Sequence, residues 1–468
     1  MKINLSFLGA ARNVTGSKYL LEANGVKILV DCGLYQERDF RSRNWEAFPV
    51  TPHTIDAVLL THAHVDHCGL LPKMVREGFT GKIYCTAATA EITEIMLLDS
   101  AKLQEEDAEF KKKRHQREGR RGTFPEIPLY TVDDAESVFP LLSSARYERT
   151  LEIGDGIEVS FHEAGHVLGS SIIKIVVRQG NEQRIILFSG DIGSRNKPIL
   201  RDRAVFEEAD YIIIESTYGD RLHEKPEDIG NSLAGFINSA HELGGNIIVP
   251  SFALERAQEI LYYMNELQYE NHIPPLTVFV DSPMTNSITE VFKRHPELYD
   301  ENMTELMRQH KSPFDFPGLK MVRTVEESRE INNAEGTNMI IAGSGMCTGG
   351  RIKHHLVANI SRHESTILFV GYQAIGTLGR IIVDGAKKVR ILGQEHHVRA
   401  RIAQIQGFSA HADRDGLLRW LSGFKKAPRH LFVTHGESEV ARSFGKFVEE
   451  KTGWKISVPE YLDEAALD

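Results

Sequence analysis

The chain has 468 residues, and its 55 Lys and Arg against 65 Asp and Glu give a formal net charge of −10. With 41% hydrophobic and 26% charged residues, the composition is that of a folded globular protein and excludes a mainly disordered or fibrous chain. The overall negative charge disfavours a polyanionic partner, whereas 20 histidines are sufficient for a metal centre or an acid–base site. At about 100 to 200 residues per domain, the length predicts two or three domains.

The N-terminal segment MKINLSFLGAARNV lacks the apolar core of a signal peptide, and no later stretch approaches about eighteen consecutive apolar residues. We therefore expect a cytoplasmic protein that makes no contact with a membrane. The four cysteines form no C-x-x-C pair, so they predict buried thiols in a reducing compartment rather than a disulfide scaffold. They are Cys32, Cys68, Cys85 and Cys347.

The N-terminal part of the chain reads as strands joined by tight turns. Short apolar runs in residues 1–60 predict strands, and Asn24-Gly25 between two of them predicts a β-hairpin. Residues 87–118 have the composition of a helix that is apolar at first and highly charged later. A second hairpin is predicted around Gly180-Asn181, and the strand YIIIEST follows it.

A different pattern begins at about Tyr218. Apolar runs such as NIIVPSF, LTVFVDSP, NMIIAGSG and STILFVGY alternate with helical segments, which predicts a parallel sheet with helices on both faces. After about Val389 short strands and helices return. The simplest arrangement is one α/β domain that is interrupted by an inserted parallel α/β domain.

A cluster of metal-ligand residues follows the predicted strand DAVLLT directly, in the run His62-Ala63-His64-Val65-Asp66-His67. Residues two apart at a strand end point to one side, so His62 and His64 can share one ion, and the next turn presents Asp66 and His67 to a second position. Imidazole and carboxylate ligands suit Zn²⁺, with Mn²⁺ or Fe as alternatives. Histidines that only fill a core or a surface would not gather at the end of a buried strand in this way.

Two coordination spheres need further ligands from other strand ends. His166 precedes a predicted strand and Asp191 follows the next one, where its two carboxylate oxygens could bridge both ions. Each residue taken alone is also compatible with a glycine-flanked turn. Asp31, at the end of VKILVDCG, is either an acceptor that orients the histidines or a turn-capping residue.

The pattern T-H-x-H-x-D-H with downstream Gly-His and Gly-Asp strand ends resembles the metallo-β-lactamase superfamily. The resemblance implies an αββα sandwich that holds two zinc ions and a bridging hydroxide. It assigns His62, His64 and His166 to the first ion, Asp66 and His67 to the second, and Asp191 to both.

Three later motifs resemble the β-CASP branch of that superfamily, the nucleases of nucleic-acid processing. They contain Glu215 in IIIESTYGD, His411 in GFSAHAD and His435 in FVTHGES, and the similarity extends over GAARNVTGS, PSFALERAQEIL, DSPMT and GSGMCTGGR. The resemblance implies a metallo-β-lactamase domain in residues 1–218 and 409–468, with a β-CASP domain inserted at 219–408. It makes His435 a ligand of the second zinc ion and places His411, Glu215 and Asp66 among the catalytic residues, with His411 as a general acid held by Glu215.

Two further segments are candidates for contact with RNA. The glycine-rich loop GSGMCTGGR could bind a phosphate through backbone N–H groups, with Ser344, Gly345 and Arg351 in or beside it and Ser409 farther along, or it could be a tight turn. The basic run Lys111 to Arg114, with Arg117, Arg120 and Arg121, could approach RNA or form a solvated helix face.

The leading functional hypothesis is a two-zinc endoribonuclease that cuts single-stranded RNA to leave a 5′-phosphate and a 3′-hydroxyl in RNA processing or decay. The resemblance is closest to the mRNA 3′-end-processing endonuclease and its bacterial and archaeal relatives, which implies either a second copy of the chain or processing-complex subunits as protein partners. One alternative is a small-ester or lactam hydrolase, which would leave the insertion and Glu215, His411 and His435 without a role. The other is a non-catalytic RNA-binding subunit, which would not need the complete ligand set found here.

Overall fold

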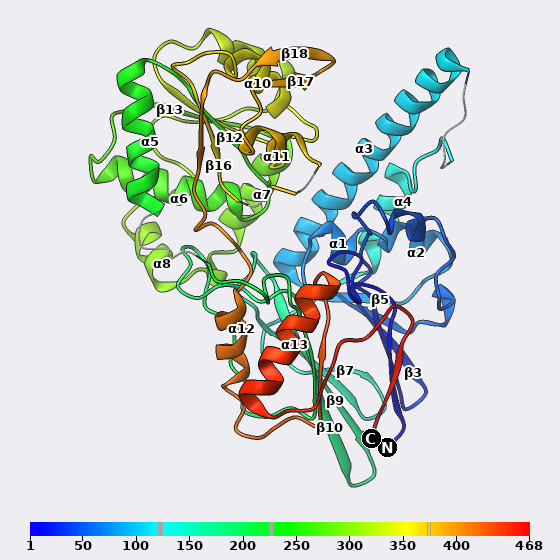
Figure 1. Cartoon of the computed structure of the whole chain (residues 1–468). Helices are drawn as coiled ribbons and strands as arrows, with labels where there is room; N and C mark the ends of the chain where they lie inside the picture. Colours follow the sequence, from blue (N-terminus) through cyan, green and yellow to red (C-terminus); the bar gives the residue numbers. More distant parts are fainter. Residues whose placement is uncertain (120–124, 224–228, 372, 375) are drawn as a thin grey trace. The chain divides into compact units, whose positions relative to one another are not determined.

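The computed structural model describes residues 1–119, 125–223, 229–371, 373–374 and 376–468 (Figure 1). The chain divides into two compact units. The first unit comprises Met1–Arg195, Asp202–Leu222 and His411–Asp468, and the second comprises Asn196–Arg201 and His223–Ala410. Two segments of the second unit therefore interrupt the sequence of the first unit. No helix in the described ranges combines the length and the apolar character that crossing a membrane requires.

The first unit contains two seven-stranded sheets. In spatial order, the strands of one sheet are β22 (Glu464–Leu467), β1 (Ile3–Phe7), β2 (Tyr19–Ala23), β3 (Val26–Val30), β4 (Ala57–Leu59), β5 (Lys82–Thr86) and β6 (Leu142–Ala145). Those of the other are β21 (Ile456–Ser457), β20 (His430–Val433), β11 (Tyr211–Ile214), β10 (Glu182–Phe188), β9 (Ser171–Gln179), β8 (Ile157–Glu163) and β7 (Leu151–Gly154).

The two predicted hairpins are confirmed. Strands β2 and β3 pair antiparallel, and the turn residues Asn24 and Gly25 have φ values of 53° and 80°, as the type I′ turn of a two-residue hairpin requires. Strands β9 and β10 also pair antiparallel on either side of Gly180. Both sheets also contain parallel pairs. These are β3 with β4 in one sheet, and β10 with β11 and β11 with β20 in the other. The parallel pairs bring several carboxyl strand ends together.

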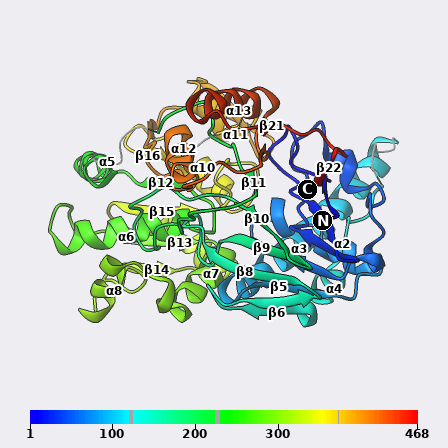
Figure 2. The same ribbon diagram turned by 90° about the horizontal axis from the view of Figure 1, so that it is seen from below.

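Apolar side chains from both sheets form one buried layer between them, including Phe7 from β1 and Phe161 and Phe188 from β8 and β10. A second buried cluster joins the outer face of the first sheet to α2 and α3, and a third joins the other sheet to α12 and α13. Figure 2 shows these helix pairs on opposite sides of the two sheets. The helices of this unit are α1 (Val65–Cys68), α2 (Leu71–Arg76), α3 (Ala87–Glu118), α4 (Val132–Glu136), α12 (Arg414–Leu421) and α13 (Ser438–Thr452). The predicted αββα sandwich is confirmed.

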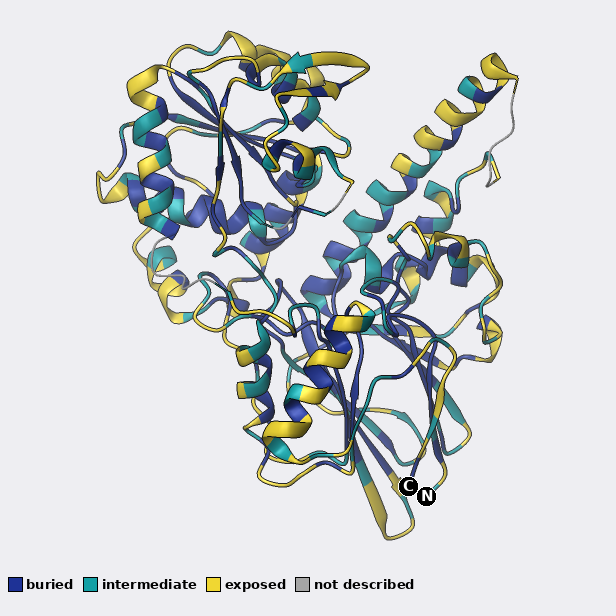
Figure 3. Cartoon of the chain, viewed as in Figure 1, coloured by how far each residue is buried: buried dark blue, intermediate teal, exposed yellow. Residues whose placement is uncertain are grey.

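The long helix α3 matches the predicted range 87–118. The Thr86 side chain caps its N-terminus by accepting a hydrogen bond from the Thr89 backbone N–H, and Gly119 ends it in the left-handed conformation. Its first half is buried against the sheet and its far half is largely exposed (Figure 3). The change follows the sequence, which is apolar at first and charged later.

The second unit is built on a six-stranded sheet in which every pair of neighbours is parallel. Its spatial order is β14 (Leu319–Met321), β13 (Thr277–Asp281), β15 (Asn338–Ala342), β12 (Ile247–Pro250), β16 (Thr366–Phe369) and β19 (Arg401–Gln404). A separate hairpin joins β17 (Lys388–Ile391) and β18 (Gln394–His397). The helices are α5 (Ile229–Leu243), α6 (Arg256–Tyr269), α7 (Pro283–Arg294), α8 (Glu301–Arg308), α9 (Val325–Glu330), α10 (Ile352–Asn359) and α11 (Leu378–Val383). The predicted inserted parallel α/β domain is confirmed.

Candidate metal centre

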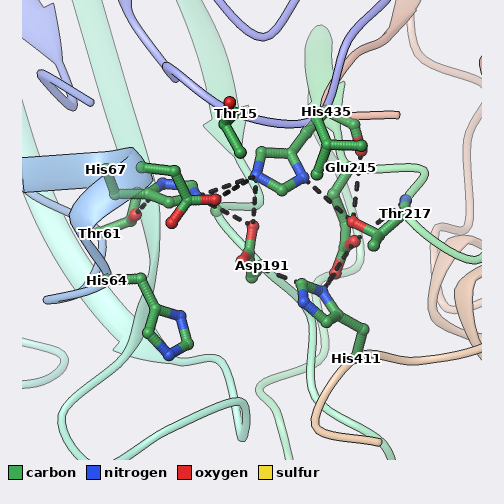
Figure 4. Close-up of polar contacts among 12 residues, drawn as sticks. Thr15, Thr61, His64, His67, Asp191, Glu215, Thr217, His411 and His435 are labelled. Atoms are coloured by element: carbon green, nitrogen blue, oxygen red, sulfur yellow. Dashed lines mark hydrogen bonds and ion pairs between the residues drawn. The ribbon is translucent and has the colours of Figure 1, made fainter. Parts of the chain in front are cut away.

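Carboxyl ends of strands in the first unit supply most of the candidate ligands. The His62 to His67 run follows β4 and includes α1, while Asp191 follows β10 and His435 follows β20. His166 lies in the loop after β8. Several of these side chains point toward one another in Figure 4. The antiparallel pairing of Gly193 with His411 brings the returning segment of the chain beside Asp191.

The first set of ligand atoms comes from His62, His64, His166 and Asp191, which the structure brings together. His62 Nε2 lies 3.0 Å from His64 Nδ1, and His166 Nε2 lies 3.3 Å from the same atom. Asp191 Oδ2 lies 3.4 Å from His62 Nε2 and 3.5 Å from His166 Nε2. Four donor atoms therefore converge on one point.

The second set consists of Asp66, His67 and His435, with the other oxygen of Asp191. His67 Nε2 lies 3.1 Å from His435 Nε2, and Asp191 Oδ1 lies 3.3 Å and 3.6 Å from these two nitrogens. Asp66 Oδ2 is 3.7 Å from His435 Nε2. The two oxygens of Asp191 thus face different ligand sets.

The spacing fits metal ions. Ligand atoms about 2.0 to 2.1 Å from a tetrahedral zinc ion stand about 3.3 Å apart, and the distances in both sets lie close to that value. Asp191 Oδ1 is buried and makes no hydrogen bond within the described part of the chain, although two ring nitrogens lie near it. Buried carboxylate and imidazole lone pairs that face one another in this way are suited to a shared cation.

The protonation states favour the same interpretation for the first set. Burial and the charge of His67 lower the pKa of His62 to about 4, and burial and the charge of His62 lower that of His64 to about 3. Burial and the charge of His411 lower the pKa of His166 well below its ordinary value. These imidazoles are neutral at pH 7, which is the form that binds a metal.

The second set carries more charge. Burial lowers the pKa of His67, but the carboxylates of Asp191 and Asp31 raise it well above its ordinary value. Burial raises the pKa of Asp191, but the charges of His435 and His67 lower it far more. A cation that replaced the protons on these imidazoles would pair directly with the Asp191 carboxylate.

Asp31 holds His67 from the side away from the ligand set. Its Oδ2 accepts a hydrogen bond of 2.7 Å from His67 Nδ1, and its Oδ1 accepts one of 2.8 Å from the Thr61 backbone N–H. This bond keeps His67 Nε2 directed at the other ligands. Asp31 follows β3 and Thr61 lies just beyond the end of β4, and these neighbouring parallel strands place the two residues side by side.

Two threonines contribute to the site that sequence reasoning did not single out. Thr61 Oγ1 donates to Asp31 Oδ2 at 2.8 Å and lies 3.1 Å from His62 Nδ1. Thr217 Oγ1 lies 3.0 Å from His435 Nδ1. Thr61 is the first residue of the motif T-H-x-H-x-D-H, and the sequence signal of Thr217 is its position two residues after Glu215.

His411 and Glu215 form a pair beside the two ligand sets (Figure 4). His411 Nδ1 lies 3.1 Å from Glu215 Oε2 and 3.9 Å from Asp191 Oδ2. Glu215 is fully buried and its Oε1 also accepts a hydrogen bond from the Ile192 backbone N–H, while the His411 side chain is 20% exposed. Burial lowers the pKa of His411, but the charges of Glu215 and Asp191 raise it to about 9. His411 therefore holds a proton at neutral pH.

The glycine-rich loop lies in the second unit, after β15. Ser344 Oγ accepts hydrogen bonds from the Thr348 and Gly349 backbone N–H groups, so it stabilises the loop. Arg351 Nη1 donates to Asp281 Oδ1 at 2.6 Å and its Nη2 donates to the Arg323 carbonyl. These contacts use two of the five N–H donors of the guanidinium. Ser409 is half-buried at the C-terminal end of this unit.

The basic run on α3 is partly neutralised on its own helix. Lys111 pairs with Asp107 and Lys113 with Glu109, each one turn away. Arg120 and Arg121 lie outside the described residues. All four cysteines are buried and unpaired, as predicted from the sequence.

Known proteins share this architecture along the whole chain. Residues 20–210 match the model of the metallo-beta-lactamase superfamily domain, residues 257–382 that of the Beta-Casp domain, and residues 395–459 that of the Zn-dependent metallo-hydrolase RNA specificity domain. A crystal structure of a protein of unknown function from Enterococcus faecalis is similar in fold, with a TM-score of 0.56 at 12% identity over 100% of both chains.

Two curated relatives cover nearly all of this chain. Ribonuclease TTHA0252 of Thermus thermophilus is 38% identical over 453 residues, which are 97% of this chain and 97% of the relative. Transcription termination factor FttA of Methanocaldococcus jannaschii is 30% identical over 471 residues, which are 98% of this chain and 71% of the relative. The matches over both units show that this chain belongs to the β-CASP family of the metallo-β-lactamase superfamily, a family of metal-dependent hydrolases.

Proposed function

We propose that this protein is a zinc-dependent endoribonuclease that hydrolyses phosphodiester bonds of single-stranded RNA and leaves a 5′-phosphate and a 3′-hydroxyl. The observation that carries the proposal is the position of Asp191, whose two oxygens face two ligand sets beside the His411–Glu215 pair. The similarity to a relative named as a ribonuclease, over 97% of both chains, supports RNA as the substrate.

Two zinc ions are the cofactors we propose, because imidazole nitrogens and carboxylate oxygens at these spacings suit zinc. The first would be held by His62, His64, His166 and Asp191, and the second by Asp66, His67, His435 and Asp191. Such ions make water a nucleophile at neutral pH and offset the charge of a phosphodiester. Asp31, Thr61 and Thr217 would fix the orientation of the liganding imidazoles.

His411 is the general acid in this proposal. The ribose 3′-oxygen is a poor leaving group, so protonation at that oxygen accelerates cleavage. Glu215 contacts His411 at Nδ1, which leaves Nε2 on the opposite side of the ring to give a proton to the leaving oxygen. The carboxylate of Glu215 also stabilises the protonated imidazole before the transfer.

The remaining assignments follow from the family. We propose a metallo-β-lactamase domain in residues 1–218 and 409–468 around a β-CASP domain in 219–408. RNA phosphates would contact the loop of Ser344 and Gly345, together with Arg351 and Ser409. The complete ligand set argues for an active enzyme rather than a non-catalytic RNA-binding subunit. We further propose a cytoplasmic location, where the four buried thiols would stay reduced.

Metal analysis combined with cleavage mapping tests the proposal. The purified protein should contain two zinc ions per chain and should cut RNA labelled at either end at internal positions, with activity abolished by a chelator. A matched DNA strand and a chromogenic lactam serve as comparison substrates. DNA cleavage as fast as RNA cleavage would contradict the substrate assignment, and rapid lactam turnover without RNA cleavage would favour the small-molecule hydrolase.

A further inference from the structure

The topology of the second unit creates a ligand-binding position at the carboxyl edge of its sheet. From β12 the chain crosses β15 to reach β13, and from β15 it crosses β12 to reach β16. Crossovers between parallel strands are right-handed, so these two connections leave toward opposite faces of the sheet. Open parallel α/β sheets bind ligands in the crevice between two such loops. Here the crevice lies between the loops after β12 and β15.

Phe252 stands in the first of these loops with its ring accessible to solvent. It is 45% exposed, whereas Ser251 before it and Ala253 and Leu254 after it are buried. The backbone N–H of Ser251 donates to the Ala342 carbonyl at 3.0 Å, which holds the two loops together at the strand ends. Burial of the neighbouring residues fixes the backbone that carries this exposed aromatic ring.

The second loop forms a support for the ring at Gly345. A Cβ atom at Gly345 would lie 2.8 Å from Cδ2, 2.9 Å from Cε2 and 3.1 Å from Cγ of Phe252, closer than side-chain atoms approach. Only glycine therefore lets the ring lie directly against this loop. Gln373 Nε2 donates to the Gly345 carbonyl at 3.0 Å and holds the support in place. Gly345 therefore lies against the Phe252 ring while Phe252 stays 45% exposed.

We propose that Phe252 is a base-stacking residue that receives one base of the RNA strand at this crevice. This inference rests on the proposed function and names one contact of the substrate. A nucleobase is a planar aromatic group that stacks on an exposed ring whatever its sequence identity. Ser344 Oγ accepts hydrogen bonds from the Thr348 and Gly349 backbone N–H groups and lies 3.2 Å from Thr348 Oγ1, so it fixes the glycine-rich loop beside Phe252. The crevice thus presents a fixed, exposed aromatic ring to a base.

The test uses the full-length protein with three substitutions, Phe252→Ala, Phe252→Leu and Phe252→Trp. The dissociation constant for RNA and the KM should both rise about 5- to 100-fold in the alanine and leucine variants. This is the range measured for loss of one base–aromatic stack. The tryptophan variant should retain the affinity of the wild type, because it keeps an aromatic face. Tyr269→Ala is the matched control, since Tyr269 is 43% exposed and lies at the end of α6 that is remote from the Phe252 loop.

A series of RNAs with one base removed at successive positions gives the decisive readout. In the wild type, removal of the base at one position should lower RNA affinity by the same factor as Phe252→Ala. In the Phe252→Ala variant, removal of that base should cause no further loss of affinity. If base removal lowered RNA affinity equally in both proteins at every position, the inference would be overturned. The proposed RNA cleavage would be unaffected by that result. Full affinity of Phe252→Leu would indicate an apolar protein contact and would also overturn it. A wild type that neither binds nor cleaves RNA would overturn both this inference and the proposed function.

Discussion

His411 Nδ1 lies 3.1 Å from Glu215 Oε2, although 196 positions separate the two residues in the chain. Glu215 follows β11, and the segment that carries His411 pairs with Gly193 just beyond Asp191. The pair is therefore formed by the part of the chain before the inserted unit and the part after it. Glu215 is buried and doubly hydrogen-bonded, so it holds the imidazole in one orientation.

Replacing His411 by alanine should lower RNA cleavage about 10²- to 10⁴-fold, the contribution of a positioned general acid. Glu215→Gln should also lower cleavage, because the neutral amide no longer stabilises the protonated imidazole. His411→Ala should retain zinc, since His411 belongs to no candidate ligand group, whereas the Glu215 carboxylate lies within 4.8 Å of ligand atoms of Asp191 and His435. The measurements are single-turnover cleavage and metal content. His363→Ala, at an imidazole that is 87% exposed, is the control. Loss of zinc in His411→Ala equal to that in His67→Ala would contradict the assignment.

Metal stoichiometry should distinguish Asp191 from the other carboxylate ligand. Asp191→Ala removes an oxygen from each ligand set and should lower zinc content at both sites. Asp66→Ala should reduce only the second site, because Asp66 contacts His435 but not the first set. Zinc per chain is measured by elemental analysis after dialysis against a fixed free-zinc concentration. Retention of two ions by Asp191→Ala would show that this residue is not shared.

Removal of the metal should also lower the stability of the first unit. A ligand present at about 1,000 times its dissociation constant adds roughly 4 kcal/mol to the free energy of unfolding. Calorimetry with and without a chelator should therefore show a lower melting temperature for the metal-free protein. In the His166→Ala and Asp66→Ala variants the chelator should have a smaller effect. An unchanged melting temperature would mean that these residues hold no metal in solution.

Lys18 gives a prediction about pH. It is buried, its Nζ donates to the carbonyls of Gly16 and Gly33, and burial lowers its pKa from 10.5 to about 8. Between these two values the unfolded chain binds more protons than the folded one, so the Lys18 contribution to stability rises with pH. The rise amounts to roughly 3 kcal/mol across this window, and below pH 8 the contribution is constant.

Comparison with a Lys18→Met variant isolates this contribution from other groups that titrate at high pH. Unfolding by urea should be followed from pH 7.5 to 10.5 for both proteins. The free energy of unfolding of the wild type, minus that of the variant, should increase over this range. Lys426→Met, at a side chain that is 82% exposed, should show no such difference. A flat difference for Lys18→Met would mean that Lys18 keeps an ordinary pKa.

Gly33 supports the turn that carries Asp66 and His67. A Cβ at Gly33 would lie 1.6 Å from the Asp66 carbonyl oxygen, which also accepts a hydrogen bond from the Ser17 backbone N–H. Gly33→Ala should therefore displace the turn, reduce zinc content and destabilise the protein by about 1 to 3 kcal/mol or more. Gly235→Ala in α5 meets open space and should instead stabilise by about 1 kcal/mol. Full zinc content in Gly33→Ala would contradict this role.

Local sequence determined much of the fold because the relevant interactions are short in range. Asn24-Gly25 specified a hairpin because both residues tolerate positive φ. Thr86 and Gly119 cap the two ends of the helix of residues 87–118 and so fix where it begins and ends. Strand and helix periodicity predicted the inserted parallel sheet. The short strand β14 of that sheet was not anticipated, because its three residues carry too little pattern.

The candidate metal ligands were equally visible in the sequence, because histidines and carboxylates at strand ends have a recognisable spacing. Tertiary structure decided which groups orient them. The Thr61 contact with Asp31 and the Thr217 contact with His435 join ends of neighbouring strands that lie 30 and 218 positions apart in the chain. Burial in the folded unit removes water from His62 and Asp191 and so sets which side chains are neutral and which are charged. The sequence alone determined which residues are candidate metal ligands. Burial and long-range contacts in the folded protein determined the orientation and protonation state of each of these groups.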